Sequence, residues 1–317
     1  MDVAIGQGVV GRVFAHALET RGAVVPCWSY VTDGLAAHGQ PELVFTLVRP
    51  ADAGAEGAAE EPLQLLGAIA GLAAQGRLVF AGDYTELGAQ GLLGRPSLRG
   101  LAYETAWPMH GVTMPPGTLS AVALVGHEMD TVKRYGSLRV LARLGRASAF
   151  FPTASWCVPD REPLMGPESG TVLEGVASAR FHGVTATLEG DRIVLGVARR
   201  SHAQIAQQLP ALPPEAACAL FASLSPIADA CLVWSPGQRA PEAISPQGSQ
   251  GAHIAGCFAL FVPQQQADGG NPFEDGFAIM LSDASWARLR DALVAGHAVD
   301  VPAAAPEMKG VRLAWHD

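Results

Sequence analysis

Short apolar runs alternate with segments of helical spacing along the first half of the chain. The first three runs are residues 2–5, 23–28 and 43–48. Their length and bulky composition are typical of strands buried on both faces of a parallel sheet. After the first run comes a glycine-rich turn, and apolar residues then recur at helical spacing up to Leu18. The chain is therefore predicted to open with a strand, a glycine turn and an amphipathic helix.

This alternation continues to about residue 155. Further strands are predicted at residues 77–82, 101–108, 120–125 and 147–151. Helices are predicted at residues 62–74 and 130–144. Strands that alternate with helices form a parallel sheet with helices on both faces. Residues 1–155 are therefore expected to form an N-terminal Rossmann domain, an α/β fold with a doubly wound parallel sheet that binds a dinucleotide.

The second half of the chain has a different pattern. Residues 156–170 are rich in Pro, Gly and charged residues, which predicts a linker between domains. Residues 171–317 are expected to form a smaller mixed α+β domain for substrate binding or dimerisation. Its predicted strands are 183–189, 192–197, 257–262 and 277–281, the first two forming either a hairpin or a crossover. Its predicted helices are 202–209, 214–223 and 283–295, with irregular polar sequence at 235–250.

Composition narrows the classes of partner. The 317 residues are 49% hydrophobic and 16% charged, enough apolar material for two packed cores. A formal net charge of -9 without a Lys/Arg-rich run argues against nucleic acid. The five cysteines are far apart and form no C-x-x-C pair, which favours reduced thiols over disulfides or a metal site. With no signal sequence and no membrane-spanning run, a cytoplasmic protein that does not enter membranes is expected.

The glycine turn has the spacing of a dinucleotide-binding motif, Gly6-Gln7-Gly8-Val9-Val10-Gly11-Arg12. A strand before it and a helix after it would let main-chain N–H groups at the helix N-terminus hold a pyrophosphate. In that arrangement Gly6 allows the turn, Gly8 allows close approach of the ligand, and Gly11 lets the helix pack on the sheet. The alternative is a structural turn with incidental glycines in a chain that contains 36 of them.

The residues after the second and third strands bear on the choice of cofactor. NAD needs an acidic residue at the end of the second strand, and this chain has Ser29 and Tyr30 there, so NADP is favoured and NAD stays possible. Arg12 or Arg49 could supply charge to a 2'-phosphate. Two further segments, Val48-Arg49-Pro50 and Gly82-Asp83, follow strands at the edge where ligands bind in such sheets, and both could equally be ordinary turns.

The opening from Val3 to Ala15 resembles the first strand and helix of the prephenate, ketopantoate and opine dehydrogenases. Over roughly the first 205 residues the order of elements is similar to that of staphylopine-type opine dehydrogenases. The resemblance implies a nicotinamide-dependent reduction of a 2-keto acid or imine. The chain carries no recognisable catalytic signature of the opine family, and the 112 residues that remain are fewer than such enzymes usually carry.

Reduction of a carbonyl or imine needs a proton donor near the nicotinamide. His110 and His127 follow predicted strands at the ligand edge and are the candidate catalytic residues, although each could be an ordinary exposed histidine. The sequence favours an NAD(P)H-dependent reductase acting on a small metabolite, as a possible homodimer. The alternative is a Rossmann-fold protein without turnover that serves as a cofactor-binding or scaffold partner in a biosynthetic or regulatory assembly.

Overall fold

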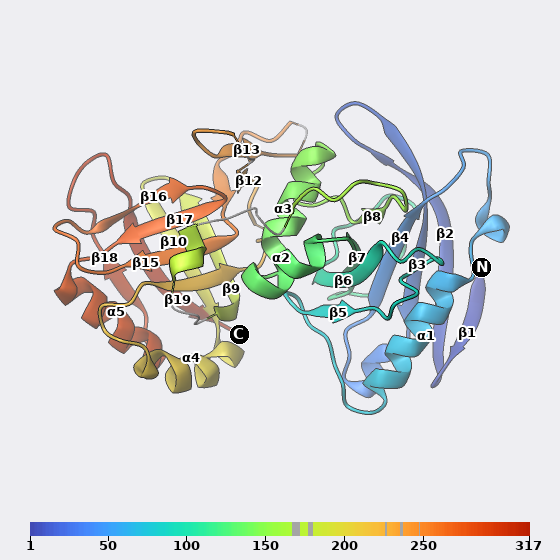
Figure 1. Cartoon of the computed structure of the whole chain (residues 1–317), viewed down its shortest axis with the longest axis horizontal. Helices are drawn as coiled ribbons and strands as arrows, with labels where there is room; N and C mark the ends of the chain where they lie inside the picture. Colours follow the sequence, from blue (N-terminus) through green and yellow to red (C-terminus); the bar gives the residue numbers. More distant parts are fainter. Residues whose placement is uncertain (167–171, 177–179, 226, 235–236, 247) are drawn as a thin grey trace. The chain divides into compact units, whose positions relative to one another are not determined.

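The computed structural model describes residues 1–166, 172–176, 180–225, 227–234, 237–246 and 248–317 (Figure 1). The chain divides into two compact units. Unit 1 contains Met1–Ser137 and Ala154–Pro167, and unit 2 contains Leu138–Thr153 and Glu168–Asp317. Each unit is built on its own sheet. None of the helices over the described residues is both long and apolar enough to cross a membrane.

The sheet of unit 1 is largely antiparallel. Its strands are β1 (Asp2–Gly6), β2 (Val9–Glu19), β3 (Val24–Asp33), β4 (Leu43–Val48), β5 (Tyr84–Glu86), β6 (Leu98–Thr105), β7 (Leu119–Val125) and β8 (Trp156–Cys157). They lie in the order β1-β2-β3-β4-β7-β6-β5, with β8 beside β4. Among the described strands of this sheet, only β4 with β7 and β4 with β8 pair in parallel. The helices of this unit are α1 (Glu61–Ala73) and α2 (Glu128–Tyr135), with short 3-10 turns η1 (Leu35–His38) and η2 (Ala55–Gly57).

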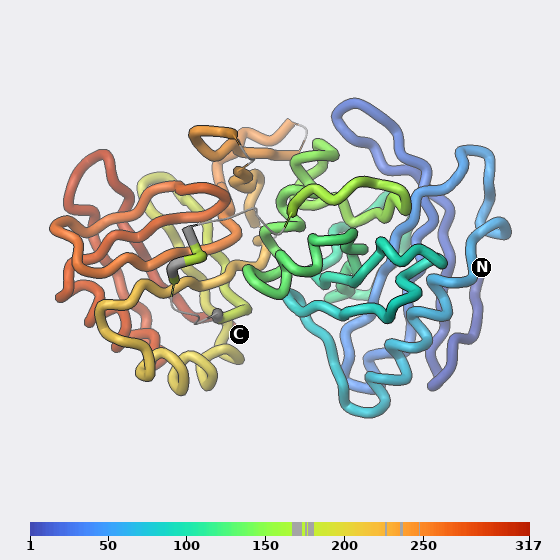
Figure 2. Tube along the Cα trace, in the orientation of Figure 1, coloured from blue at the N-terminus to red at the C-terminus, as the bar shows by residue number. Residues whose placement is uncertain are grey.

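The predicted Rossmann domain is therefore wrong. The segment expected to be the first helix is strand β2, whose Val9, Gly11 and Val13 are buried while the residues between them are partly exposed. This period of two matches a strand whose faces differ. The blue trace in Figure 2 follows β1 directly into β2, which pairs with it antiparallel. A doubly wound fold needs parallel strands joined through helices, and neither is present at this position.

Helix α1 covers one face of this sheet. Pro62 stands in its first turn, where the missing N–H costs nothing. Leu66, Ile69 and Ala70 are buried in one cluster with residues of the strands such as Tyr30 and Phe45. The prediction of a helix at residues 62–74 is confirmed.

Unit 2 contains a second mixed sheet. Its strands are β9 (Arg180–Glu189), β10 (Arg192–Ala198), β11 (Cys218–Ala222), β12 (Ala230–Val233), β13 (Glu242–Ile244), β14 (His253–Ala255), β15 (Phe258–Val262), β16 (Gly269–Phe273), β17 (Gly276–Met280), β18 (Val299–Val301) and β19 (Gly310–His316). The helices are α3 (Ser137–Ala147), α4 (His202–Gln208) and α5 (Asp283–Ala295), and the 3-10 turns are η3 (Val172–Gly175), η4 (Arg199–Ser201) and η5 (Leu209–Ala211).

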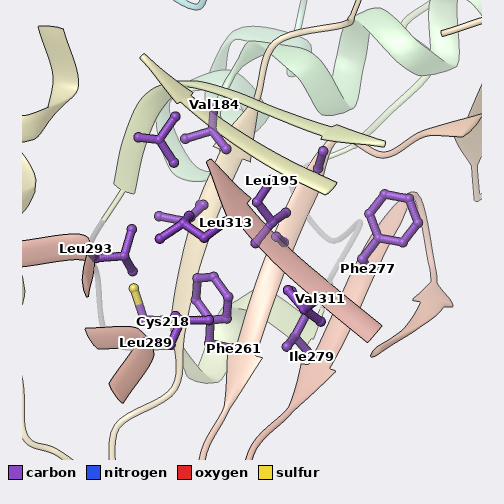
Figure 3. Packing of buried hydrophobic residues seen from close by; sticks show 14 of the residues in the cluster. Val184, Leu195, Cys218, Phe261, Phe277, Ile279, Leu289, Leu293, Val311 and Leu313 are labelled. Atoms are coloured by element: carbon purple, nitrogen blue, oxygen red, sulfur yellow. The ribbon is translucent and has the colours of Figure 1, made fainter. Parts of the chain in front are cut away.

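The core of unit 2 joins these strands to α4 and α5. In Figure 3 the side chains of Leu195, Phe261, Ile279 and Leu313 lie together with Leu289 of α5. Phe261 also stacks on Trp286, with ring centroids 5.5 Å apart. The burial of these large side chains holds α5 to the sheet.

Several element predictions outside the Rossmann opening are confirmed. They are the strands at 43–48, 120–125, 257–262 and 277–281, the helices at 202–209 and 283–295, and the hairpin of β9 and β10. Others are wrong. The helix predicted at 214–223 is strand β11, and the segments 77–82 and 147–151 are not strands. The helix predicted at 130–144 is divided into α2 and α3 at Gly136, whose φ of 91° no helix accommodates.

The expected linker does not form a simple boundary between the units. The chain passes from one unit to the other after Ser137, after Thr153 and after Pro167. Within residues 156–170, β8 belongs to the sheet of unit 1, and residues 167–170 lie outside the described part of the chain.

Candidate functional site

The glycine motif forms a hairpin turn. Gly6 pairs with Val9, and the two residues between them, Gln7 and Gly8, have φ angles of 55° and 76°. Positive φ at both central residues defines the tight turn whose twist suits a two-stranded hairpin. Val10, Gly11 and Arg12 continue along β2 instead of entering a helix. The physical basis for holding a pyrophosphate here, main-chain amides at a helix N-terminus, is therefore missing.

Two glycines bring α1 close to this hairpin. A Cβ on Gly11 would lie 2.5 Å from Leu63 Cδ2, and a Cβ on Gly67 would lie 2.7 Å from the carbonyl oxygen of Ile5. A side chain at Gly67 would force the helix and the strand apart because the close atom belongs to the main chain, whereas one at Gly11 would require the Leu63 side chain to move. The predicted role of Gly11, at the start of a helix that packs on the sheet, is wrong because Gly11 lies inside strand β2 and the helix that packs against it is α1.

A groove of about 560 Å³ lies where β1 meets α1. Its lining is Met1, Val3, Ala4 and Ile5 from the strand, Glu56, Ala58 and Glu60 from the segment before the helix, and Leu63, Gln64 and Gly67 from α1. Val3 and Ile5 are partly buried against the core of unit 1, so the floor of the groove is apolar. It is the candidate functional site.

The strand beside this groove is an edge strand of the sheet. β1 stands at the end of the strand order and pairs with β2 alone among the described strands. Met1 and Val13 exchange main-chain hydrogen bonds of 3.1 and 2.8 Å. Because hydrogen-bonded and non-hydrogen-bonded pairs alternate in an antiparallel ladder, the N–H and C=O groups of Asp2 and Ala4 point to the open edge. Those groups are available to another strand.

The ionisable groups that line the groove away from the chain terminus are acidic. Glu56 and Glu60 are both exposed, and neither forms an ion pair within the described part of the chain. Arg12 on the neighbouring strand is engaged by Asp33 and lies 4.0 Å from Asp2. The groove therefore combines an apolar floor with two exposed carboxylates at its rim, and the N-terminal ammonium of Met1 is the cationic group in its lining.

The predicted cofactor residues Ser29 and Tyr30 lie on β3 and point to opposite faces. Ser29 is buried in a polar chain, with its Oγ 2.8 Å from His16 Nε2 and 2.7 Å from Thr46 Oγ1. Tyr30 is part of the core beneath α1. Burial lowers the pKa of His16, and the nearby Arg49 acts in the same direction. The chain of polar groups thus holds a neutral histidine inside unit 1.

The segments after the predicted third and fourth strands form hydrogen bonds with main-chain groups of unit 1. Arg49, between Val48 and Pro50, donates hydrogen bonds to the carbonyls of Cys27, Pro50, Ala51 and Ala53. Gly82 and Asp83 form a turn beside β6, where Gly82 donates to the carbonyl of Tyr103 and Asp83 accepts from the amide of Phe80. These contacts give both segments a structural role.

The two candidate catalytic histidines are exposed and lie in different places. His110 is in the loop between β6 and β7, next to Met109, whose sulfur contacts Thr46 Oγ1 at 3.9 Å. His127 precedes α2, with its Nδ1 3.1 Å from Asp130 Oδ2. The structure thus brings the loop of His110 near Ser29 and leaves His127 and the glycine turn apart from it.

Sequence reasoning missed the groove. Its signal was the alternation of Val3 and Ile5 with Asp2 and Ala4, which is typical of a strand with one buried face. That alternation spans few residues and was interpreted as a continuous apolar run. Glu56, Glu60 and Gly67 join the site through the fold alone.

The chain matches no protein-family profile and no curated protein. Matches among solved structures include Drosophila Suppressor of Fused, which is 11% identical. The alignment covers 97% of this chain and 89% of that chain, with a TM-score of 0.38.

Proposed function

We propose that the chain is a binding protein that takes an extended cationic peptide segment as an additional strand beside β1. The observation that carries this proposal is the groove of about 560 Å³ next to an open strand edge. Strand addition uses main-chain hydrogen bonds for affinity and pockets for alternate side chains for selectivity. The outward N–H and C=O groups of Asp2 and Ala4 supply the main-chain hydrogen bonds. The apolar floor formed by Val3, Ile5 and Leu63 supplies the pocket for side chains of the bound segment.

Charge indicates the chemistry of the partner. Lys or Arg side chains of a bound segment would reach Glu56 and Glu60, which have no described cationic partner. The formal net charge of -9 would also accelerate the encounter with a cationic segment. The preferred ligand therefore alternates apolar residues with Lys or Arg.

The alternative stated from the sequence was a Rossmann-fold protein without turnover that serves as a cofactor-binding or scaffold partner, and this proposal keeps its scaffold part while the Rossmann fold is wrong. The reductase interpretation depended on a helix after Gly11, and β2 occupies that position. We therefore propose recognition of a partner chain in place of hydride transfer with NADP.

Selection from a random dodecapeptide display library against the full chain tests the proposal. We expect enrichment of sequences in which apolar residues alternate with Lys or Arg. Ala4→Pro should abolish their binding because proline removes the outward N–H that the added strand needs, whereas the ladder with β2 does not use this group. Ala4→Val keeps the N–H and is the matched control. Losing this bond and the backbone fit around it should weaken binding by at least about tenfold, which removes detectable binding of peptides selected at modest affinity.

Two further measurements distinguish the occupants of the edge. Glu56→Gln with Glu60→Gln should weaken the selected peptides and reduce the dependence of their affinity on salt. Peptides that bind Ala4→Pro as well as the unmodified chain would refute strand addition at β1. If light scattering instead shows a dimer that Ala4→Pro converts to a monomer, the edge is occupied by a second copy and the peptide proposal fails.

A further inference from the structure

Helix α3 of unit 2 carries two buried arginines. Arg139 is 2% exposed and Arg143 is 4% exposed. Their spacing of four residues places them on one face of the helix. Both guanidinium groups lie over the ring of Trp234, with the Cζ atoms 5.6 and 5.0 Å from its centroid.

Arg139 has acidic partners. Its Nη1 donates to Asp275 Oδ1 at 3.0 Å, and its Nη2 donates to Glu274 Oε2 at 3.2 Å. Asp275 is fully buried and Glu274 nearly so. These bonds compensate the charge of Arg139 and use its terminal donors.

Arg143 is not satisfied in this way. The nearest carboxylate oxygen, Asp275 Oδ2, is 3.9 Å from its Nη2, which is too long for a hydrogen bond. Its Nε, Nη1 and Nη2 are all buried without a hydrogen-bond partner within the described residues. Burial of a guanidinium without hydrogen-bond acceptors is unfavourable, because the group loses its bonds to water and gains none in return. Asp275 Oδ2 is also buried without a hydrogen-bond partner, so within the described residues this part of the cluster lacks a group at hydrogen-bond distance from Arg143.

We infer that unit 2 binds a carboxylate at Arg143. The planar guanidinium presents parallel N–H donors that match the two oxygens of a carboxylate. Trp234 supplies a flat apolar wall beside them, and its indole N–H is held by the carbonyl of Gln238 at 3.2 Å. A single negative charge is favoured over a dianion because Asp275 and Glu274 already place two acidic groups in the cluster. This site uses other residues than the peptide groove and does not depend on it.

Thermal unfolding of the full chain tests this inference, with acetate as the probe and chloride at the same ionic strength and pH as the reference. We expect acetate to raise the unfolding midpoint with a saturable dependence on concentration, because a ligand of the folded state stabilises it. Arg143→Met should abolish the acetate response. Arg146→Met on the same helix, where the arginine is 38% exposed and paired with Glu242, should retain it.

The conservative variant separates recognition from folding. Arg143→Lys keeps a positive charge but lacks the two parallel N–H donors of the guanidinium. The acetate concentration needed for half of the stabilising effect should therefore rise at least tenfold, while the chain stays folded. Equal unfolding midpoints in acetate and chloride would overturn the inference, since bridging water would then satisfy Arg143. An undiminished response in Arg143→Lys, or a stronger one to phosphate than to acetate, would overturn it as well.

Discussion

Gly67 of α1 lies against the carbonyl oxygen of Ile5 on β1 so closely that a Cβ at this position would stand 2.7 Å from it. The contact sets the distance between the helix and the edge strand, and therefore the width of the groove. Because the clashing atom belongs to the main chain, no side-chain rotation can relieve the overlap.

Gly67→Ala should destabilise unit 1 by about 1–3 kcal/mol, because the overlap outweighs the better helix propensity of alanine. Gly71→Ala is the matched control in the same helix, where a Cβ would have no neighbour within 4 Å. It should stabilise the unit by about 0.5–1 kcal/mol. Urea unfolding of the two variants checks both signs. Equal effects at the two positions would show that the close approach to Ile5 is unimportant.

The hairpin turn provides a second test. Gly8→Val should destabilise the chain by about 1–2 kcal/mol or more, because a β-branched residue is strained at a φ of 76°. Gln7→Asn should stabilise it by a few tenths of a kcal/mol or more, since asparagine adopts the φ of 55° at this position more readily than glutamine. Urea unfolding again provides the readout. A Gly8→Val chain as stable as the original would contradict the turn geometry.

His16 makes stability depend on pH. Its pKa is lowered from the ordinary value of 6.5 because burial disfavours the charged ring. Below about pH 6.5 the unfolded chain takes up a proton that the folded chain refuses, so this group's contribution to stability is intact at higher pH and is lost as the pH falls. His16→Gln should flatten the fall between pH 7.5 and 5.5. The comparison of urea midpoints for the two chains isolates this residue, and parallel profiles would exclude it as the cause.

The cysteines should be inert in the folded chain. Cys27, Cys157, Cys218, Cys231 and Cys257 are all buried. Burial raises the pKa of Cys27, Cys157, Cys218 and Cys231 to about 12, which leaves little reactive thiolate at neutral pH. Ellman's reagent should therefore react slowly with the native protein and rapidly with all five thiols in denaturant. Rapid reaction of even one thiol in the native chain would show that its surroundings open.

The helices that sequence predicted well have strong local signals at their ends. Pro62 stands in the first turn of α1. Ser282 accepts a hydrogen bond from the amide of Ser285 at the start of α5, and Gly296 ends that helix with a φ of 72°. Caps of this kind act within a few residues, so they can be identified without knowledge of the fold.

The opening of the chain was mispredicted because two periods compete there. Val10, Phe14 and Leu18 fit helical spacing, but Val9, Gly11 and Val13 alternate as a strand and form the buried face. The turn sequence is a weak signal for a hairpin, because Gln7 replaces the Asn or Asp that usually precedes glycine in such hairpins. Pairing with β3 over the whole length of β2 decides the outcome, and that pairing is invisible in a local window.

Contacts with neighbouring strands also determine that β11 is a strand and not a helix. Its residues, Cys218–Ala222, are uniformly buried and carry no alternation. A short apolar run of this kind fits a helix or a strand equally well. Its position between β9 and β15 makes it a strand. The groove was beyond prediction for the same reason, since Glu56 and Gly67 meet Ile5 only through the fold.

The chain passes repeatedly between the two units, and this limits how it can fold during synthesis and how it can be cut into fragments. No single cut yields both units whole, because residues 138–153 belong to unit 2 while residues 154–167 complete unit 1. During synthesis, α3 with its two buried arginines leaves the ribosome before β8 is available to the first sheet. The units therefore cannot complete folding strictly one after the other. A fragment that ends near residue 155 would contain α3 but would lack Glu274 and Asp275, the acidic partners of its Arg139.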